Sequence, residues 1–270
     1  MAKSKLLVRP KNNASGLVHR VTPRSAGWTY VGFEVHDLKP GAILAKRCGD
    51  MEICIVIVSG KARVKTGAGK SVQDFGLLGG RTSPFDGGPW AVYVSARSNY
   101  TIVADTACEI AICAAPGKGT LPARVISPEQ CAVEVRGHGT NTRYVRNILP
   151  ENEPADSLLV VEVITPGGNW SSYPPHKHDR DALPEESFLE ETYYHRLDPP
   201  QGFAVQRVYT DDRSLDETTV VTDRDVVLVP KGYHPVAAAH GYSLYYLNVM
   251  AGPRRIWKFW NEPEHQWLLA

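Results

Sequence analysis

The chain alternates between short apolar runs and clusters of glycine and proline. Runs rich in β-branched and aromatic residues that are bounded by such turn residues are typical of β-strands. The runs that predict strands cover residues 28–36, 52–58, 91–94, 100–104 and 109–114 in the first half, and 158–164, 191–196, 203–209, 225–229 and 242–250 in the second. No segment shows a long helical period. The pattern therefore predicts an all-β sandwich or barrel.

The strands fall into two sets, one in each half of the chain. A chain of 270 residues is long enough for two modest cores. Glycine and proline crowd together between Pro116 and Pro154, which is typical of a join between domains. We expect a duplicated unit, with one domain at residues 1–120 and a second at 121–270.

Charge and hydropathy exclude several classes of function. Thirty Lys and Arg oppose 29 Asp and Glu, and there is no basic block, so nucleic acid is not an expected partner. Residues 1–20 contain only Leu6, Leu7 and Val8 as an apolar run, which is too short for a signal peptide, and no later run could span a bilayer. The sequence predicts a soluble cytoplasmic enzyme that is neither exported nor inserted into a membrane.

The cysteines do not predict a disulfide framework. Their number is odd, no C-x-x-C pair occurs, and all of them lie in the first half. They are Cys48, Cys54, Cys108, Cys113 and Cys131. We expect buried thiols in a reducing compartment.

His176 and His178 form the most specific local motif. On an extended segment, residues two apart point to the same side, so both rings face one way. A carboxylate from the pair Glu190 and Glu191, together with a third histidine, would complete a set suited to Zn, Fe, Mn, Ni or Co. An H-x-H pair is often only a feature of surface composition. The glutamate strand and the turn at residues 230–234 favour the metal site over that reading.

The first half has a comparable strand without these histidines. Glu52 begins an apolar strand that ends at a glycine turn, Gly60, but no H-x-H precedes it. We therefore expect Glu52 to be structural. Any metal chemistry is expected in the second half of the chain.

The second half resembles known proteins in its motifs. Gly168, the H-x-H pair, Glu191 and the segment 225–234 resemble the two metal-binding motifs of the cupin superfamily, whose members are double-stranded β-helix barrels. Longer phrases resemble, more narrowly, the 5-deoxy-glucuronate isomerase family of bacterial inositol catabolism, whose members have two tandem cupin barrels. These phrases are residues 171–179, 190–196, 201–204, 207–213, 229–235 and 245–253.

The resemblance implies a ligand set for one divalent metal ion (Zn, Mn, Fe, Ni or Co). Its members are His176, His178, Glu191 and His234. The common cupin motif places the last histidine three residues after a glycine, whereas His234 follows Gly232 by two, so His240 stays an alternative.

The resemblance also implies a reaction. The substrate would be a small sugar acid, 5-deoxy-D-glucuronate, which is converted to 2-deoxy-5-keto-D-gluconate through an enediol that an electrophile stabilises. The base would be Glu190, Glu186 or His195, which the sequence cannot rank. Another cupin enzyme, such as a different uronate isomerase, an oxygenase or a decarboxylase, and a non-catalytic sugar-binding cupin are the alternatives.

Three residues are candidates for binding the substrate. Arg207 and Tyr209 lie on one side of their strand, where they could meet a substrate carboxylate, although an outward Arg207 fits equally well. Lys177 lies between the two histidines and points away from the metal under strict alternation, which disfavours a direct catalytic role. Exposed sheet edges make a homo-oligomer an open possibility.

Overall fold

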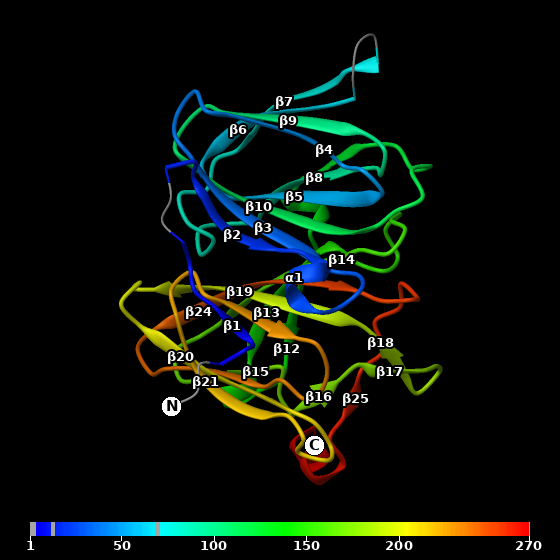
Figure 1. Cartoon of the computed structure of the whole chain (residues 1–270). Helices are drawn as coiled ribbons and strands as arrows, with labels where there is room; N and C mark the ends of the chain where they lie inside the picture. The colour runs from blue at the N-terminus through cyan, green and yellow to red at the C-terminus, as the bar shows by residue number, and fades with distance from the viewer. Residues whose placement is uncertain (1–3, 12–13, 68–70, 270) are drawn as a thin grey trace. The chain divides into compact units, whose positions relative to one another are not determined.

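In the computed structural model of the protein, nearly all of the regular secondary structure is β-strand (Figure 1). The structure describes residues 4–11, 14–67 and 71–269. Within these residues the only α-helix is the four-residue α1 (Pro23–Ala26). Two compact units are present: the first contains Lys11–Ala132 and Asn147–Val160, and the second contains Met1–Pro10, Val133–Arg146 and Val161–Ala270. The all-β prediction is confirmed, and the boundary at residue 120 stays a prediction.

The first unit contains two antiparallel sheets. Six strands follow the order β11-β8-β5-β10-β3-β2, and four follow the order β4-β9-β6-β7. Their bounds are β2 (Leu17–Val21), β3 (Gly32–Leu38), β4 (Ile43–Arg47), β5 (Met51–Ser59), β6 (Lys61–Thr66), β7 (Gln73–Gly79), β8 (Trp90–Val94), β9 (Asn99–Ala104), β10 (Cys108–Pro116) and β11 (Arg124–Ile126), with the 3₁₀ helix η2 (Pro128–Gln130).

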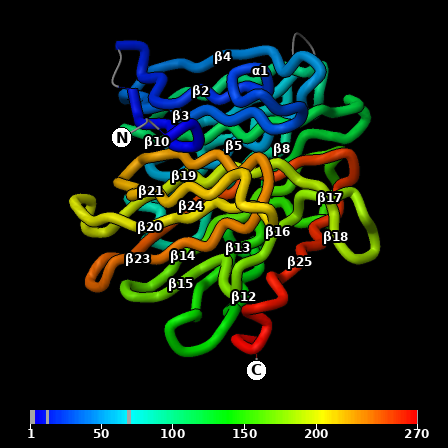
Figure 2. Tube along the Cα trace, turned by 60° about the horizontal axis from the view of Figure 1, so that its bottom comes forward, coloured from blue at the N-terminus to red at the C-terminus, as the bar shows by residue number. Residues whose placement is uncertain are grey.

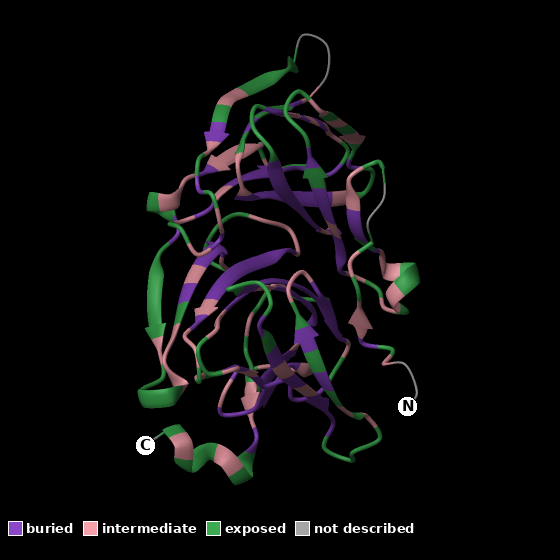
Figure 3. Ribbon diagram, turned by 90° about the vertical axis from the view of Figure 1, so that its left-hand side faces the viewer, coloured by how far each residue is buried: buried purple, intermediate pink, exposed green. Residues whose placement is uncertain are grey.

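One apolar core joins the two sheets of the first unit. Ile55 of β5 and Ile110 of β10 come from the larger sheet, and Val64 of β6 and Ile102 of β9 come from the smaller one; all four are fully buried. Figure 3 colours the whole ribbon by burial, and its buried residues gather on the strands more than on the loops. Packing two sheets face to face buries the apolar side of each strand, which is the arrangement of a jelly roll.

The second unit is also antiparallel and has more strands. A seven-stranded sheet has the order β1-β22-β19-β24-β14-β13-β12, a four-stranded sheet has the order β15-β23-β20-β21, and the pairs β16-β25 and β17-β18 complete it. Strands β13 and β14 contain residues of both units. The bounds are β1 (Leu7–Val8), β12 (Val133–Arg136), β13 (Arg143–Leu149), β14 (Leu159–Thr165), β15 (Trp170–Ser171), β16 (His176–Lys177), β17 (Asp179–Ala182), β18 (Glu186–Phe188), β19 (Glu190–Asp198), β20 (Phe203–Tyr209), β21 (Asp216–Thr222), β22 (Val226–Val229), β23 (Val236–Ala238), β24 (Ser243–Ala251) and β25 (Trp260–Asn261), with the 3₁₀ helices η3 (Gly139–Asn141) and η4 (Pro263–Leu269).

Each of the ten predicted strands overlaps an observed one. The prediction for residues 203–209 matches β20 at both ends. The prediction for residues 28–36 starts too early, because β3 begins at Gly32. Before it, the Trp28 indole donates a hydrogen bond to the carbonyl of Val31 (2.7 Å), which holds this segment as a loop.

Glu52 ties a distant segment to β5 within the first unit. Its carboxylate accepts backbone N–H bonds from Asp156 (2.8 Å), Ser157 (2.6 Å) and Leu158 (2.7 Å), and a hydroxyl bond from Tyr93 (2.7 Å). Four donors on a fully buried carboxylate offset the cost of removing its charge from water. These contacts hold residues 156–158 against β5, which is a structural role of the kind expected for Glu52.

The five cysteines are free and buried, as the sequence predicts. Burial raises the pKa of the Cys48 thiol to about 11, so this thiol stays protonated at neutral pH. No helix in the described part of the chain is long and apolar enough to cross a membrane.

Candidate metal centre

Three buried side chains of the second unit converge on one point. Potential ligand atoms of His178, Glu191 and His234 all lie within 4.8 Å of one another. The Nε2 atom of His178 is 3.0 Å from Oε2 of Glu191, and the Nε2 atom of His234 is 3.3 Å from the same oxygen. Two imidazoles and a carboxylate with their ligand atoms at this spacing could hold a metal ion. We call these three residues the histidine-glutamate cluster.

Backbone carbonyls orient both imidazoles of the cluster. The Nδ1 atom of His178 donates to the Leu189 carbonyl (2.9 Å), and that of His234 donates to the Gly232 carbonyl (2.8 Å). These bonds fix the tautomer in which each Nε2 carries the lone pair. Nε2 of His234 is buried and has no hydrogen-bond partner, despite its distance of 3.3 Å from Glu191. An orphaned, inward lone pair fits a site that a cation completes.

The strand β19 supplies the carboxylate. Alternation along β19 puts Glu191, Tyr193 and His195 on one face, and all three are buried. Glu191 pairs in register with Val229 of β22 on one side and Met250 of β24 on the other. A central strand between two neighbours holds the carboxylate rigidly.

A glycine allows the chain to reach His234. Gly232 has φ +91°, and a Cβ atom there would lie 2.4 Å from the carbonyl oxygen of Tyr209. Only glycine tolerates both conditions, since the left-handed region and the close approach each exclude a side chain. Its N–H group also donates to the Asp179 carboxylate (2.9 Å).

His176 lies beside the cluster on β16, which pairs with β25 (Figure 2). Its ring centroid is 4.9 Å from that of His234, 6.3 Å from that of His178 and 4.6 Å from that of Phe259. The rings of His176 and His178 therefore both approach His234, as the two-residue period predicts. His176 is outside the set of three whose ligand atoms lie within 4.8 Å of one another.

Burial and mutual repulsion keep most of these rings neutral. Burial, followed by the charges of His234 and His178, places the pKa of His176 well below its usual value. Burial lowers the pKa of His234 to about 4. Burial opposes protonation of His178 as well, but the hydrogen bond and charge of Glu191 raise its pKa. Neutral imidazoles are the form that binds a metal.

Two cavities of the second unit meet the site. A small one of about 30 Å³ reaches Glu191 and His176, and a larger one of about 310 Å³ reaches His176 from the side of Phe259 and η4. The small cavity is lined by Arg136, Arg143, Val145, Val163, Ser172, His176, Glu191, Tyr193, Tyr246, Asn248 and Trp257. The larger cavity has the volume of a small-molecule site, whereas the smaller one, beside Glu191, has room for water only.

Hydroxyl groups that the sequence did not single out border the small cavity. The Tyr193 hydroxyl is 2.8 Å from Oγ of Ser172, and the Tyr246 hydroxyl bonds Ser171. Tyr193 could have been predicted as a site residue, because it lies two residues after Glu191 on the same strand and therefore on the same face. Tyr246 comes from β24, and nothing in the sequence points to it.

The three candidate bases have different surroundings. His195 is buried with Nε2 3.0 Å from Oε1 of Gln206, and burial lowers its pKa to about 3. Glu190 is buried at the start of β19, adjacent to Glu191 and so on the opposite face of the strand. Glu186 accepts bonds from the N–H groups of Asp179 (2.8 Å) and Arg180 (3.1 Å) and from the Arg180 guanidinium (2.7 Å). Their roles stay predictions.

The three candidate substrate residues have other partners. Lys177 is buried, and its ammonium contacts Asp179 (3.0 Å) and Asp211 (2.5 Å). Arg207 makes a two-pronged ion pair with Asp216 (2.8 and 2.7 Å) and lies over the ring of Tyr209, whose hydroxyl bonds Glu262. The outward alternative for Arg207 matches its exposure, and the substrate role of all three stays a prediction.

The alternative fourth ligand, His240, is exposed on the turn after β23. Its Nδ1 atom lies near Gly168. The histidine that the fold brings to Glu191 is His234.

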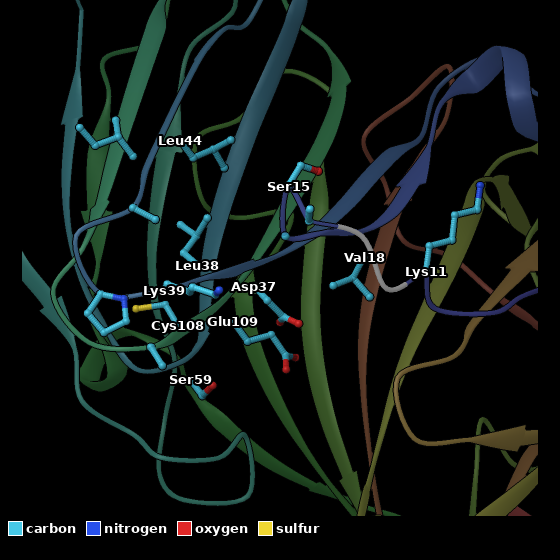
Figure 4. Close-up of a pocket in the computed structure, with 16 residues that line it drawn as sticks. Lys11, Ser15, Val18, Asp37, Leu38, Lys39, Leu44, Ser59, Cys108 and Glu109 are labelled. Atoms are coloured by element: carbon cyan, nitrogen blue, oxygen red, sulfur yellow. The ribbon is translucent and has the colours of Figure 1, made fainter.

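A larger cavity of about 810 Å³ lies in the first unit (Figure 4). Its wall combines apolar groups such as Leu38 and Leu44 with the charged groups of Lys11, Asp37 and Glu109. No histidine appears among its described lining residues. Size alone therefore does not locate the candidate chemistry.

A family model and individual relatives agree on the family to which this chain is similar. The model of the KduI/IolB family matches residues 6–268. A protein of Geobacillus kaustophilus named 5-deoxy-glucuronate isomerase is 58% identical over 258 residues, which cover 95% of this chain and 92% of that protein. A protein of the same name from Bacillus subtilis strain 168 is 51% identical over 272 residues, which cover 98% of this chain and 99% of that protein.

Solved structures agree with the fold. The crystal structure of an IolB-like protein from Salmonella typhimurium superposes with a TM-score of 0.95 at 50% identity, and covers 99% of this chain and 100% of that chain. An oxalate decarboxylase of Bacillus subtilis has a TM-score of 0.63 at 15% identity, over 95% of this chain and 79% of that chain. The second likeness shows a shared cupin fold and nothing about the reaction.

Proposed function

The chain belongs to the KduI/IolB family, and from this premise we propose that it isomerises 5-deoxy-D-glucuronate to 2-deoxy-5-keto-D-gluconate in myo-inositol catabolism. The observation that carries the proposal is the identity of 51 to 58% with 5-deoxy-glucuronate isomerases over nearly the whole of both chains. The enzyme is an aldose–ketose isomerase that acts on a small sugar acid. Cytoplasmic location and self-association stay predictions.

One divalent ion is proposed at the histidine-glutamate cluster, with His176, His178, Glu191 and His234 as its ligands. The orphaned Nε2 atom of His234 and the two anchored Nδ1 atoms support this assignment. A bound divalent ion supplies Lewis acidity for the carbonyl and hydroxyl oxygens of the sugar. Zn, Mn, Fe, Ni and Co all suit this donor set, so the identity of the ion is left to elemental analysis.

The chain's own residues prepare the site for proton transfer. Burial of His178, Glu191 and His234 excludes water from the reacting end of the sugar and strengthens electrostatic interactions there. The isomerisation moves a proton from C2 to C1. His195, which lies on the same face of β19 as Glu191, is the first candidate for this transfer, and Glu190, which lies on the opposite face, is the second. Burial lowers the pKa of His195 to about 3, so its imidazole is neutral at pH 7.

The proposal is tested by NMR with 5-deoxy-D-glucuronate under strict anoxia in deuterated water. We expect conversion to the ketose with deuterium entering at C1 and no net redox change. An oxygenase would require oxygen, and a decarboxylase would release carbon dioxide from the sugar. A metal-replete protein that leaves this sugar unchanged but converts another uronate would contradict the substrate assignment.

The proton-transfer assignment has its own test. If His195 is the base, His195→Gln should lower the rate of exchange at C2 by about 100-fold or more, and Glu190→Gln tests the other candidate in the same way. Metal content should stay unchanged in the variant of the true base. Full exchange in both variants would remove both residues from this role.

A further inference from the structure

One arginine of the second unit lies where the two cavities near the cluster share a wall. Arg143 begins β13 and lines both the cavity of about 30 Å³ and the cavity of about 310 Å³. His176 is the other residue common to both walls. Arg143 therefore faces the space through which a small molecule would reach Glu191.

The guanidinium of Arg143 is positioned but not neutralised. Its NH1 nitrogen donates to the carbonyls of Asn141 (3.1 Å) and Tyr173 (3.1 Å). Among the residues that the structure describes, no carboxylate pairs with it. Two carbonyl contacts hold the plane of the group and leave its other N–H donors for a ligand.

Arg136, which also lines the small cavity, behaves differently. It pairs with Glu134 (2.6 Å) and lies over the ring of Trp257. Its charge is thus largely compensated, whereas that of Arg143 is not. Burial is the main cause that lowers the pKa of Arg143, and a charge that is partly removed from water gains most from an anionic partner.

The surroundings of Arg143 are built for a small polar molecule. The larger cavity combines apolar walls from Phe259, Leu268 and Leu269 with polar groups from Asn141 and Asn261. A volume of about 310 Å³ is at the lower end of the range for small-molecule sites, which suits a compact ligand. A planar guanidinium can bind a carboxylate through two parallel hydrogen bonds.

We propose that Arg143 binds the carboxylate of the substrate and thereby directs the opposite, aldehyde end toward Glu191 and His178. This inference rests on the proposed function for the identity of the sugar acid. It assigns the carboxylate to a residue of β13 in place of Arg207, which already pairs with Asp216. Arg143 acts as a specificity residue: it distinguishes a sugar acid from the neutral sugar of the same length.

The test compares two sugars on wild type, Arg143→Ala and Arg143→Lys. The first sugar is 5-deoxy-D-glucuronate, and the second is its neutral analogue with a hydroxymethyl group in place of the carboxylate. For Arg143→Ala we expect kcat/KM for the acid to fall about 100-fold while kcat/KM for the neutral sugar is unchanged. Arg143→Lys keeps the charge but loses the fork, so a fall of about 10-fold is expected.

Controls separate this effect from damage to the fold. Arg254, an exposed arginine of the same unit that pairs with Asp181 (3.5 Å), provides the matched control Arg254→Ala, which should keep the wild-type ratio of acid to neutral sugar. Metal content and the unfolding midpoint are measured for each variant. If Arg143→Ala does not fold, Arg143→Lys carries the comparison.

A binding measurement makes the two proposals independent. D-gluconate, a sugar acid without a carbonyl group, is titrated into each metal-loaded protein and followed by calorimetry. Binding by wild type and its loss in Arg143→Ala would support the carboxylate site even if wild type failed to isomerise 5-deoxy-D-glucuronate, in which case only the proposed function would fall. Two results would overturn the role of Arg143. One is an Arg143→Ala variant whose ratio of kcat/KM for the acid to kcat/KM for the neutral sugar equals that of wild type. The other is a wild type that does not bind D-gluconate.

Discussion

His178 and His234 reach Glu191 from different parts of the chain, but each is held by the same device. In both cases a backbone carbonyl accepts the Nδ1 proton, which leaves the Nε2 lone pair directed at the carboxylate. His240 has neither this burial nor this contact with Glu191. The difference between His234 and His240 therefore tests the ligand assignment at the level of single residues.

We expect His234→Asn to lower metal affinity by about 10-fold to 100-fold or more, because it removes a donor that the fold has already oriented. His240→Asn should keep both the metal and the isomerase rate. Metal content after dialysis against a weak chelator, followed by turnover, measures both effects. Loss of metal in His240→Asn with retention in His234→Asn would reverse the assignment.

Glu34, a residue of the first unit, is expected to make the folding stability of the protein sensitive to acid. Glu34 of β3 contacts His36 (2.7 Å), Lys46 and Arg20 (3.6 Å). Burial opposes ionisation of Glu34, but the hydrogen bonds to His36 and Lys46 outweigh it and lower its pKa from 4.5 to about 2. The folded pKa is below the unfolded one, so the stabilisation is complete above about pH 4.5 and is lost as the pH falls toward 2.

Glu34→Gln should therefore flatten the loss of stability between pH 4.5 and pH 2. The difference should amount to about 1 kcal/mol, because the carboxylate is only partly buried and solvent screens its interactions. Urea unfolding at a series of pH values measures it. An identical slope in the variant and the wild type would show that Glu34 does not contribute to the acid transition.

At the scale of elements, Glu52 links β5 to the segment at residues 156–158. We expect Glu52→Gln to lower the free energy of unfolding by about 2 kcal/mol, because an amide cannot accept all four bonds and adds donors without partners. The rate per folded molecule should stay unchanged. Urea unfolding combined with turnover measures both, and an unchanged midpoint would contradict the role.

The predictability of the strands depended on their apolar content. β5 and β24 are rich in apolar residues and are bounded by turn residues, so the sequence predicted them to within one residue at each end. β6 alternates exposed and buried residues over Lys61–Thr66, but its charged positions interrupt the apolar run, and it was not predicted. β16 has only two residues, and its position depends on pairing with β25, which no local pattern encodes.

Site residues could be predicted where they are close together in the sequence, and were missed where only the fold brings them together. His176, His178 and Glu191 are close together in the sequence, and the resemblance added His234. Arg143, Tyr246 and Ser172 were missed as cavity residues, because they enter through β13, β24 and a loop whose meeting is a property of the folded chain. The sequence offered Arg207 as a candidate for a substrate carboxylate and left an outward Arg207 equally open, because alternation alone cannot distinguish an inward from an outward side chain.

At the scale of the whole molecule, the fold is compatible with a wider range of reactions than the sequence is. The oxalate decarboxylase of Bacillus subtilis shares the cupin fold at 15% identity, and the relatives named 5-deoxy-glucuronate isomerase share 51 to 58% of their residues with this chain. The same fold supports different reactions, so the architecture alone does not determine the reaction of this chain.

We propose that the isomerase depends on one divalent ion that the histidine-glutamate cluster holds. The most direct measurement removes divalent ions with a chelator, returns one metal in steps, and follows conversion of 5-deoxy-D-glucuronate by NMR. We expect no conversion without metal and recovery in proportion to bound metal, up to a single ion per chain. In Glu191→Gln we expect neither metal binding nor recovery. Full conversion by the metal-free protein, or by Glu191→Gln, would contradict the proposal.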